Sequence, residues 1–350
     1  MSADIESRAS AGDVQAQIEF ARRLDQQGRN TEAVDWLARA AKTGDAQALT
    51  LLGLKLLTGQ NAPFLPAQGV GLLSDAAKAG GAQAAEHLAV LVGGGLYARQ
   101  SWQGALDLLW RAAELGSACA QSQLAVLIGE NGGVDLGAWT SARPVQVLRA
   151  SPRVLVIDGL IPRAACEWVI EQSEPRLVRA ELYDAQTGKP TASAETRLNR
   201  IANFGLVDTS LLNLLIQARI SASLGVAMNQ LEAFAVLSYA PGEEYGEHHD
   251  YLDPAIPAYR AEIARMGQRI ATCLIYLNED YEGGQTEFPQ LGLSYRGRTG
   301  DALIFFSADQ AGTPDPRTVH AGRPATSGHK WLLSQFIRNR PVIGFEARPH

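Results

Sequence analysis

Two side chains that can bind a metal ion stand two residues apart in the second half of the chain. They are His248 and Asp250, within the stretch 239–251, and His249 lies between them. If this stretch is a strand, alternate side chains leave on the same face, so His248 and Asp250 converge while His249 points away. A His-x-Asp tripeptide is common and by default lies on the surface, so a metal site requires a third ligand from elsewhere.

The third ligand has to come from one of the remaining histidines, which are His87, His320, His329 and His350. His320 lies 70 residues after Asp250 and follows the stretch 315–319, where we expect a strand to re-enter a barrel beside the first one. Two histidines and one carboxylate on one face leave the other coordination positions of a mononuclear Fe(II) open for a co-substrate and O2. We therefore expect His320 to complete the set with His248 and Asp250.

A single lysine stands in the last long apolar stretch of the chain. Lys330 follows His320 by ten residues, after a turn marked by glycine and proline. Burying an ammonium in an apolar strand costs several kcal/mol, by order of magnitude, unless a counter-charge is present. A bound dicarboxylate would supply that charge. The alternative is that Lys330 lies at the strand end in solvent.

Several stretches of the second half resemble one enzyme family. They are 239–251, 272–278, 283–289, 300–306, His320-Ala-Gly-Arg-Pro and Gly328-His-Lys-Trp. Together they resemble the prolyl 4-hydroxylase branch of the Fe(II)/2-oxoglutarate dioxygenases, and the resemblance spans roughly residues 150–340.

The resemblance implies that His248, Asp250 and His320 bind Fe(II), with 2-oxoglutarate and O2 as co-substrates. Decarboxylation of 2-oxoglutarate would release succinate and CO2 and drive the hydroxylation of a peptidyl residue, with proline as the leading candidate. Relatives that halogenate leave the position of Asp250 open for a halide, so its presence favours hydroxylation. Ascorbate is implied as the reductant that rescues oxidised iron.

The resemblance also implies a co-substrate pocket. Lys330 would hold the distal (C5) carboxylate of 2-oxoglutarate, Tyr276 would hydrogen-bond the same carboxylate, and Tyr239 would line the pocket near the metal. Period-two alternation agrees, because it places Thr272, Leu274 and Tyr276 on one strand face that would line the cavity. For Tyr276 the alternative is an aromatic side chain that only fills the barrel.

Two positions depart from the family pattern. Gln285 stands where the Gly-Gly-x-Thr motif commonly carries Glu. Arg197 stands in the stretch 196–200, where the prolyl branch tends to have Arg-Thr-Ser. Arg197 either faces the substrate or forms a surface salt bridge.

Two further functions compete with hydroxylation of a peptidyl proline. The same oxygenase chemistry would also serve a non-prolyl side chain or a small metabolite. A scaffold in which the barrel is vestigial is the third interpretation, and the complete set of His248, Asp250, His320 and Lys330 argues against it, because a decaying site has no reason to keep all four.

The elements that must position these residues are helices followed mainly by short strands. Apolar spacing predicts helices at 162–173 and 208–225, with Asp208 capping the start of the second. Strands bounded by Gly, Pro or Asp are expected at 153–158, 232–240, 269–278, 300–306 and 330–338. The pattern predicts an α+β double-stranded β-helix (jelly roll) with supporting helices. The connection 252–268 is either a substrate lid or a solvated helical excursion at 259–266.

The first third of the chain is an internal repeat. A glycine followed four residues later by alanine recurs with spacings of 32, 36 and 36 residues, at Gly12, Gly44, Gly80 and Gly116. An amphipathic helix ending in Ala-Ala precedes each later glycine, which suits a left-handed turn. Each unit is thus a helix pair, and residues 8–128 resemble the Sel1-like branch of the tetratricopeptide family. We expect an all-α solenoid with a concave face.

This solenoid has two interpretations. It docks the protein or peptide substrate, or it is a cap that stabilises the following domain. The predicted domains are helical repeats at 1–130, a linker at 131–150 and the dioxygenase domain at 151–350. The linker is too apolar for a free tether, so we expect part of it to pack or to begin the next sheet.

Composition limits the classes of partner. The net charge is −6, from 37 acidic and 31 basic residues, and no Lys/Arg cluster could neutralise a run of phosphates, so nucleic acid is a poor candidate. The three cysteines form no paired motif, which indicates a reducing compartment. Neither a secretory signal nor a membrane-spanning stretch is expected, so we predict a cytoplasmic protein with no membrane partner.

Overall fold

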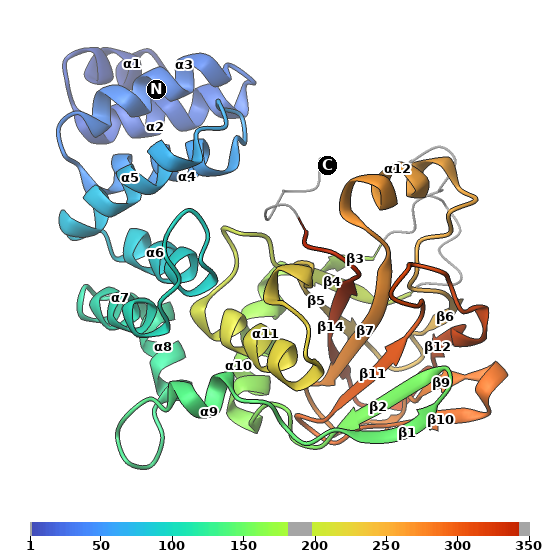
Figure 1. The fold of residues 1–350 in the computed structure, drawn as a ribbon. Coiled ribbons are helices and arrows are strands. Elements are labelled where there is room, and N and C mark those ends of the chain that lie inside the picture. The colour runs from blue at the N-terminus through green and yellow to red at the C-terminus, as the bar shows by residue number, and fades with distance from the viewer. Residues whose placement is uncertain (1, 181–197, 343–350) are drawn as a thin grey trace. The chain divides into compact units, whose positions relative to one another are not determined.

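The structure is a computed structural model that describes residues 2–180 and 198–342 (Figure 1). It divides into two compact units, which we describe separately. The first unit comprises residues 1–136 and 206–214, and the second comprises 137–205 and 215–345, in each case as far as the structure describes them.

The first unit is built of consecutive helices, as the repeat predicts. They are α1 (Ser2–Ser10), α2 (Val14–Gln26), α3 (Asn30–Ala41), α4 (Ala46–Thr58), α5 (Pro66–Lys78), α6 (Ala82–Gly94), α7 (Trp102–Glu114) and α8 (Ala118–Leu127). The four repeat glycines have φ between 81° and 95°, the left-handed region that ends a helix. After three of them, the side chain of the next residue caps the following helix; the carboxylate of Asp45, for example, accepts a hydrogen bond from Ala48 N. The helical-repeat prediction is confirmed.

Two glycines allow α4 and α5 to approach each other closely. A Cβ added at Gly69 on α5 would lie 2.6 Å from Gly53 O and 2.7 Å from Leu57 N, both backbone atoms of α4. Gly71, two residues further along α5, has open space around it. One helix therefore contains a glycine that packing requires and another that it does not.

A distant segment, residues 206–214, completes the first unit. The backbone N–H of Leu212 donates to Gln123 Oε1 on α8 at 3.2 Å, and this bond is buried. Leu206 packs against the apolar cluster of the repeats. A Cβ at Gly93 on α6 would lie 3.1 Å from Leu211 Cδ1, so the segment also follows α6 closely.

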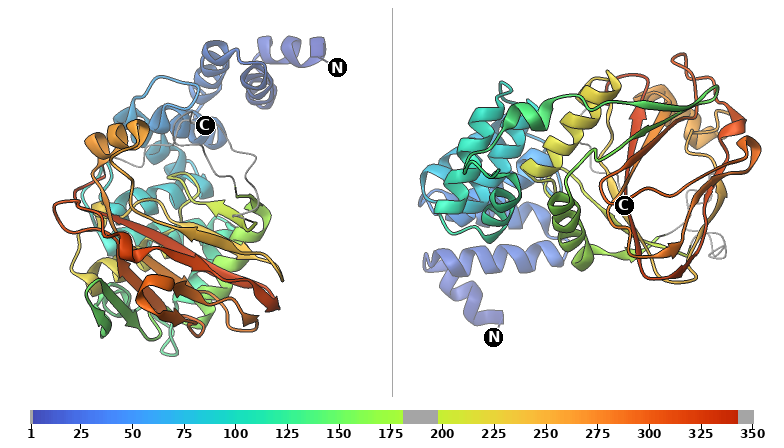
Figure 2. Two further views of the ribbon diagram at one scale, coloured as in Figure 1. Left: turned by 90° about the vertical axis from the view of Figure 1, so that its right-hand side faces the viewer. Right: turned by 90° about the horizontal axis from the view of Figure 1, so that it is seen from below.

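The second unit contains two main antiparallel sheets (Figure 2). The larger has eight strands in the order β1-β2-β11-β7-β14-β5-β4-β3, and the smaller has four in the order β10-β9-β12-β6. The larger sheet comprises β1 (Gln146–Ala150), β2 (Arg153–Ile157), β3 (Val178–Arg179), β4 (Arg200–Asn203), β5 (Ala235–Tyr239), β7 (Arg269–Tyr276), β11 (Ala302–Phe306) and β14 (Lys330–Arg338). The smaller comprises β6 (Tyr245–His248), β9 (Thr286–Phe288), β10 (Leu293–Tyr295) and β12 (His320–Gly322). A short ladder joins β8 (Glu282–Gly283) to β13 (Ala325–Ser327).

Side chains from the two sheets share one apolar core. Leu274 and Phe305 of the larger sheet lie in the same buried cluster as Phe288 of the smaller one. Interleaving of the inner faces is what holds a two-layered β structure together. Each predicted strand is present within a few residues, so the predicted α+β jelly roll is confirmed.

The other helices are α9 (Leu136–Thr140), α10 (Arg163–Ser173), α11 (Leu211–Leu224) and α12 (Pro257–Met266). The expected cap at Asp208 is wrong, because α11 begins later and Asn213 N donates to Ser210 Oγ at 3.1 Å. The helical excursion in the connection 252–268 is present as α12, and its service as a lid stays a prediction. No helix in the described ranges is long and apolar enough to cross a membrane.

Gly69→Ala should destabilise the first unit by about 1–3 kcal/mol, because the added methyl group would collide with the backbone of α4. Gly71→Ala is the matched control in the same helix, and it should stabilise the unit by about 0.5–1 kcal/mol through the better helix propensity of alanine. Denaturant unfolding of the full chain, followed by helical circular dichroism, measures both changes. Equal midpoints for the two variants would contradict this packing.

Candidate metal centre

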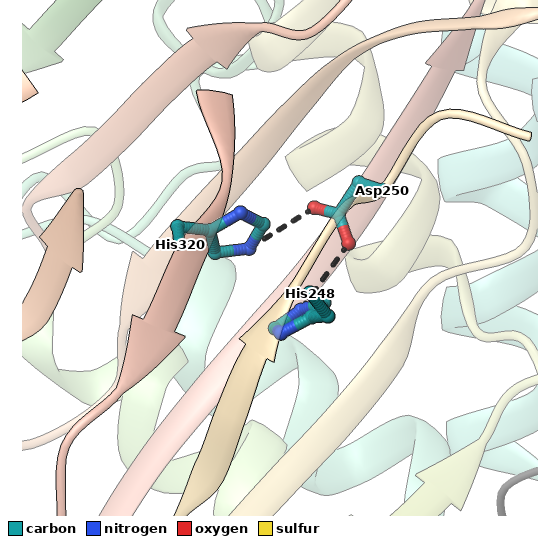
Figure 3. Close-up of side chains that lie close together, drawn as sticks. All are labelled: His248, Asp250 and His320. Atoms are coloured by element: carbon teal, nitrogen blue, oxygen red, sulfur yellow. Dashed lines mark ion pairs between the residues drawn. The ribbon is translucent and has the colours of Figure 1, made fainter. Parts of the chain in front are cut away.

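The three predicted ligands come together in the second unit (Figure 3). Each of the three side chains, His248, Asp250 and His320, offers one ligand atom, and these three atoms lie within 4.8 Å of one another. His248 Nε2 is 3.5 Å from Asp250 Oδ1, and His320 Nε2 is 3.5 Å from Asp250 Oδ2. The two imidazoles thus face one carboxylate, and three ligand atoms this close together fit a single metal ion bound by two histidines and one carboxylate.

Strand pairing places the two histidines. β12 pairs with β6 in the antiparallel sense, with His320 directly opposite His248. The expectation that one strand carries both His248 and Asp250 is wrong, because β6 ends at His248 and Asp250 lies beyond it in a bend. His249 is not part of the cluster, and its ring stacks on Tyr251 at 4.6 Å.

Backbone carbonyls determine which ring nitrogen of each histidine is free. His248 Nδ1 lies 2.8 Å from Gly246 O, and His320 Nδ1 lies 3.1 Å from Thr318 O. A carbonyl only accepts, so each Nδ1 carries a proton, and Nε2 is the ring nitrogen that faces Asp250 and is placed to bind a metal. The ring of Tyr245 also stacks on His248 with centroids 3.5 Å apart.

The protonation states suit a divalent cation. Burial lowers the pKa of His320 to about 4, so its imidazole is neutral at neutral pH. Burial acts to raise the pKa of Asp250, but His320, His248 and the hydrogen bond from Thr272 hold it well below its usual range. The Thr272 hydroxyl donates to Asp250 Oδ2 at 2.7 Å. Neutral imidazoles and an ionised carboxylate are the forms in which these side chains bind metal, so the set fits Fe(II).

Lys330 is fully buried, at 0% exposure, which excludes the solvent-exposed alternative. Its Nζ has no hydrogen-bond partner among the described residues, and burial lowers its pKa to about 7. The ammonium lies 5.0 Å from the ring centroid of Tyr239 and 6.0 Å from that of Tyr276. A buried amine with free donors fits the carboxylate of a bound co-substrate such as 2-oxoglutarate.

Tyr276 is buried and its hydroxyl is bonded within the protein. The hydroxyl lies 2.9 Å from Thr286 Oγ1 and 3.3 Å from Tyr295 O. Gly297 is required beside it, since a Cβ there would lie 2.5 Å from the ring. Tyr276 also belongs to the apolar core, so both of its predicted roles remain compatible with this position.

Sequence reasoning missed the roles of two hydroxyl side chains in the site. Thr272 is expected from alternation only to line the cavity, whereas it donates to Asp250. Thr286 stands out in the sequence only as the last residue of the Gly-Gly-x-Thr motif, whereas it contacts Tyr276. That motif is the one sequence signal that could have indicated Thr286. Arg197 and His350 lie outside the described residues.

Comparison with known proteins gives three results. Residues 234–338 match the 2OG-Fe(II) oxygenase superfamily. Prolyl 4-hydroxylase 1 of Arabidopsis thaliana is 30% identical over 230 residues, which cover 59% of this chain and 79% of that protein. Among solved structures, viral collagen prolyl hydroxylase of Paramecium Bursaria Chlorella virus-1 is 26% identical, covering 53% of this chain and 95% of that one, with a TM-score of 0.41.

The repeats match separately. A Sel1 repeat protein from Oxalobacter formigenes is 29% identical, covering 35% of this chain and 95% of that one, with a TM-score of 0.32. Identity of three residues in ten along most of the length of the plant enzyme places this chain in the 2OG-Fe(II) oxygenase superfamily, among the relatives of prolyl 4-hydroxylase.

Proposed function

We propose that this chain is an Fe(II)- and 2-oxoglutarate-dependent dioxygenase that hydroxylates a prolyl residue of a protein or peptide and releases succinate and CO2. The observation that carries the proposal is the buried ammonium of Lys330, which has no hydrogen-bond partner in the part of the chain that the structure describes and lies in the same jelly roll as the His-Asp-His cluster. The His-Asp-His cluster can bind a metal cation, and the amine of Lys330 can bind an anion. Both lie in one interior, which suits a metal ion together with a dicarboxylate that chelates it.

Each residue has a distinct part in this proposal. His248, Asp250 and His320 would hold Fe(II) through two neutral nitrogens and one carboxylate. Bound Fe(II) with 2-oxoglutarate supplies the chemistry that couples decarboxylation and O2 reduction to hydroxylation of a C–H bond. Lys330 would bind the distal carboxylate of 2-oxoglutarate, and Tyr239 would line the pocket beside that amine.

Tyr276 and Thr286 extend this pocket. Their hydroxyls contact each other at 2.9 Å, and a ligand carboxylate would compete for one of these protons. We assign Tyr276 to the distal carboxylate, together with the charge of Lys330. Ascorbate would serve as the reductant for oxidised iron.

Proline is proposed as the target because the similar proteins are prolyl hydroxylases by name. The same site chemistry would serve another side chain or a small metabolite, and locating the added oxygen by mass spectrometry separates these cases. None of the three cysteines, which all lie among the described residues, forms a disulfide, and this fits the proposed cytoplasmic location.

The repeats are proposed to dock the substrate protein. Phe64 and Tyr97 are exposed at 61% and 50%, in the connections after α4 and α6. Asn61 and Tyr97 are the two non-glycine residues of the described chain with positive φ, at 52° and 55°. Exposed aromatic rings in equivalent connections of a solenoid support a binding role for this edge, because solenoids bind through extended surfaces. The alternative is that the repeats stabilise the domain that follows them. The contacts of α6 and α8 with the segment 206–214 fit this alternative.

Asp250→Ala should lower succinate release at least about 100-fold, because two neutral imidazoles alone hold Fe(II) weakly. Removal of metal by a chelator should do the same to the wild type, with recovery on adding Fe(II). Asp253→Ala, an exposed aspartate in the same loop, is the matched control and should keep its activity. Mass spectrometry of lysate proteins then locates the added oxygen. Metal-independent succinate release would refute the oxygenase assignment.

The affinity for 2-oxoglutarate should fall as the pH rises above about 7, by up to about tenfold per pH unit, because the pKa of Lys330 is lowered to about 7 and only the ammonium form attracts the dicarboxylate. Calorimetry with redox-inert Mn(II) measures this affinity. Lys330→Met should bind more weakly and lose the pH dependence. An unchanged wild-type affinity between pH 7 and 9 would show that the amine does not bind the co-substrate.

Phe64→Ser combined with Tyr97→Ser should raise KM for the intact substrate protein about 30-fold, by removing two exposed apolar contacts of about 1 kcal/mol each. KM for a short peptide with the same proline should not change, since the peptide reaches only the oxygenase site. Val147→Ser is the control, because Val147 is 62% exposed but lies on β1 of the other unit. Equal effects on protein and peptide would refute docking by the repeats.

A further inference from the structure

Asp250 differs from the histidine ligands in how its backbone is held. His248 and His320 belong to paired strands. Asp250 lies two residues past the end of β6, in a bend that leads toward α12. A metal ligand has to be held within about 0.5 Å of its working geometry, so this segment needs a restraint other than a strand ladder.

The side chain of Gln268 supplies such a restraint at Leu252. Gln268 Oε1 accepts a hydrogen bond from Leu252 N at 2.8 Å, and Gln268 Nε2 donates to Leu252 O at 2.7 Å. These two bonds imitate the pair that a neighbouring antiparallel strand would make with Leu252. Gln268 is 2% exposed, so water does not compete for the bonds.

Gln268 is itself fixed to the centre of the larger sheet. Its backbone N–H donates to Asn339 Oδ1 at 3.0 Å, and its carbonyl accepts from Asn339 N at 3.0 Å. Gln268 directly precedes β7 and Asn339 directly follows β14, and these two strands pair with each other. We call the two hydrogen bonds between Gln268 and Leu252 the clamp. Through Gln268 and Asn339, the clamp connects the loop of Asp250 to two adjacent central strands.

The carboxylate end of Asp250 is held from the same strand. Thr272 on β7 donates to Asp250 Oδ2, while Gln268, four residues earlier, holds the backbone two residues after Asp250. One bond limits rotation of the carboxylate, and the other pair limits movement of the chain that carries it.

We propose that Gln268 is a positioning residue for the metal ligand Asp250, acting through the two hydrogen bonds to Leu252. This inference rests on the proposed function, since it takes Asp250 to be a ligand. It adds a residue that touches neither the metal cluster nor the co-substrate pocket. Replacing Gln268 is expected to weaken metal binding directly, and to affect co-substrate binding and turnover only through that loss of metal.

The test uses the full chain with Gln268→Met, which keeps the length of the side chain but removes both bonds. Co(II) or Mn(II) titration should show metal binding weakened about 10- to 100-fold, as for other residues that orient a ligand. Hydrogen exchange at the Leu252 amide should accelerate more than exchange at the amides of β7. Gln268→Glu, which keeps the acceptor and loses the donor, should lie between Gln268→Met and the wild type.

Gln335→Met is the matched control. Gln335 is also fully buried, and its amide donates to a backbone carbonyl, Glu232 O, at 2.6 Å. It lies in β14 opposite Cys273, whose side chain points away from the face of Thr272. Gln335→Met should lower the unfolding temperature but leave metal affinity unchanged.

Weakened metal binding in both Gln268 variants, with Gln335→Met unchanged, supports the clamp. Wild-type affinity in Gln268→Met overturns it, and so does an equal loss in Gln335→Met, which would reveal general destabilisation. If Gln268→Met does not fold, the affinity of Gln268→Glu decides between these outcomes. A wild-type chain that binds no divalent metal would overturn the proposed function as well, which distinguishes the two failures.

Discussion

The antiparallel pairing of β6 with β12 is the constraint on which the metal cluster depends. It sets His320 opposite His248, and a slip of one residue would turn His320 to the other face of the sheet. Packing fixes the register, because the rings of Phe288 and Phe305 lie 5.5 and 4.5 Å from the ring of His320. The apolar core that closes the jelly roll thus also places a ligand.

This interior contains charges that a purely structural core would avoid. Lys330 is buried without a counter-ion in contact among the described residues, and Asp250 is ionised between two imidazoles. Buried charges destabilise a fold unless something of opposite sign is near. A divalent cation would neutralise the charge of Asp250, and a ligand carboxylate would neutralise that of Lys330. Metal and co-substrate should therefore stabilise the protein as well as equip it for chemistry.

Sequence reasoning worked where one residue type has few roles. A histidine at the right distance from His-x-Asp and a lysine in an apolar strand are both unusual, so residue type and spacing are enough to single out His320 and Lys330. Thr272 and Gln268 are not singled out in this way, because threonine and glutamine are ordinary near the start of a strand. Their roles depend on which atoms they meet across the fold, and only tertiary contacts reveal those.

Local errors in the prediction have the same origin. Asp208 is a good helix cap by type, but Ser210 lies where α11 begins and takes that role. The strand through His248 and Asp250 followed from period-two alternation, which correctly brought the two side chains together. Alternation could not show that the strand ends between them, since a strand ends where its cross-strand pairing ends, and β6 has its last partner at His248, opposite His320.

That break bears on the lid interpretation of the connection 252–268. α12 has no buried residue, and two arginines attach it: Arg338 bonds the side chain of Glu262, and Arg340 donates to the backbone carbonyl of Ile263. Apolar burial therefore does little to hold α12, whereas the two ends of the connection are joined at Leu252 and Gln268. A lid over a metal site has to move without moving the ligand beside it. Joining the ends of the connection meets this requirement, because displacement of α12 then stops at Leu252 before it reaches Asp250.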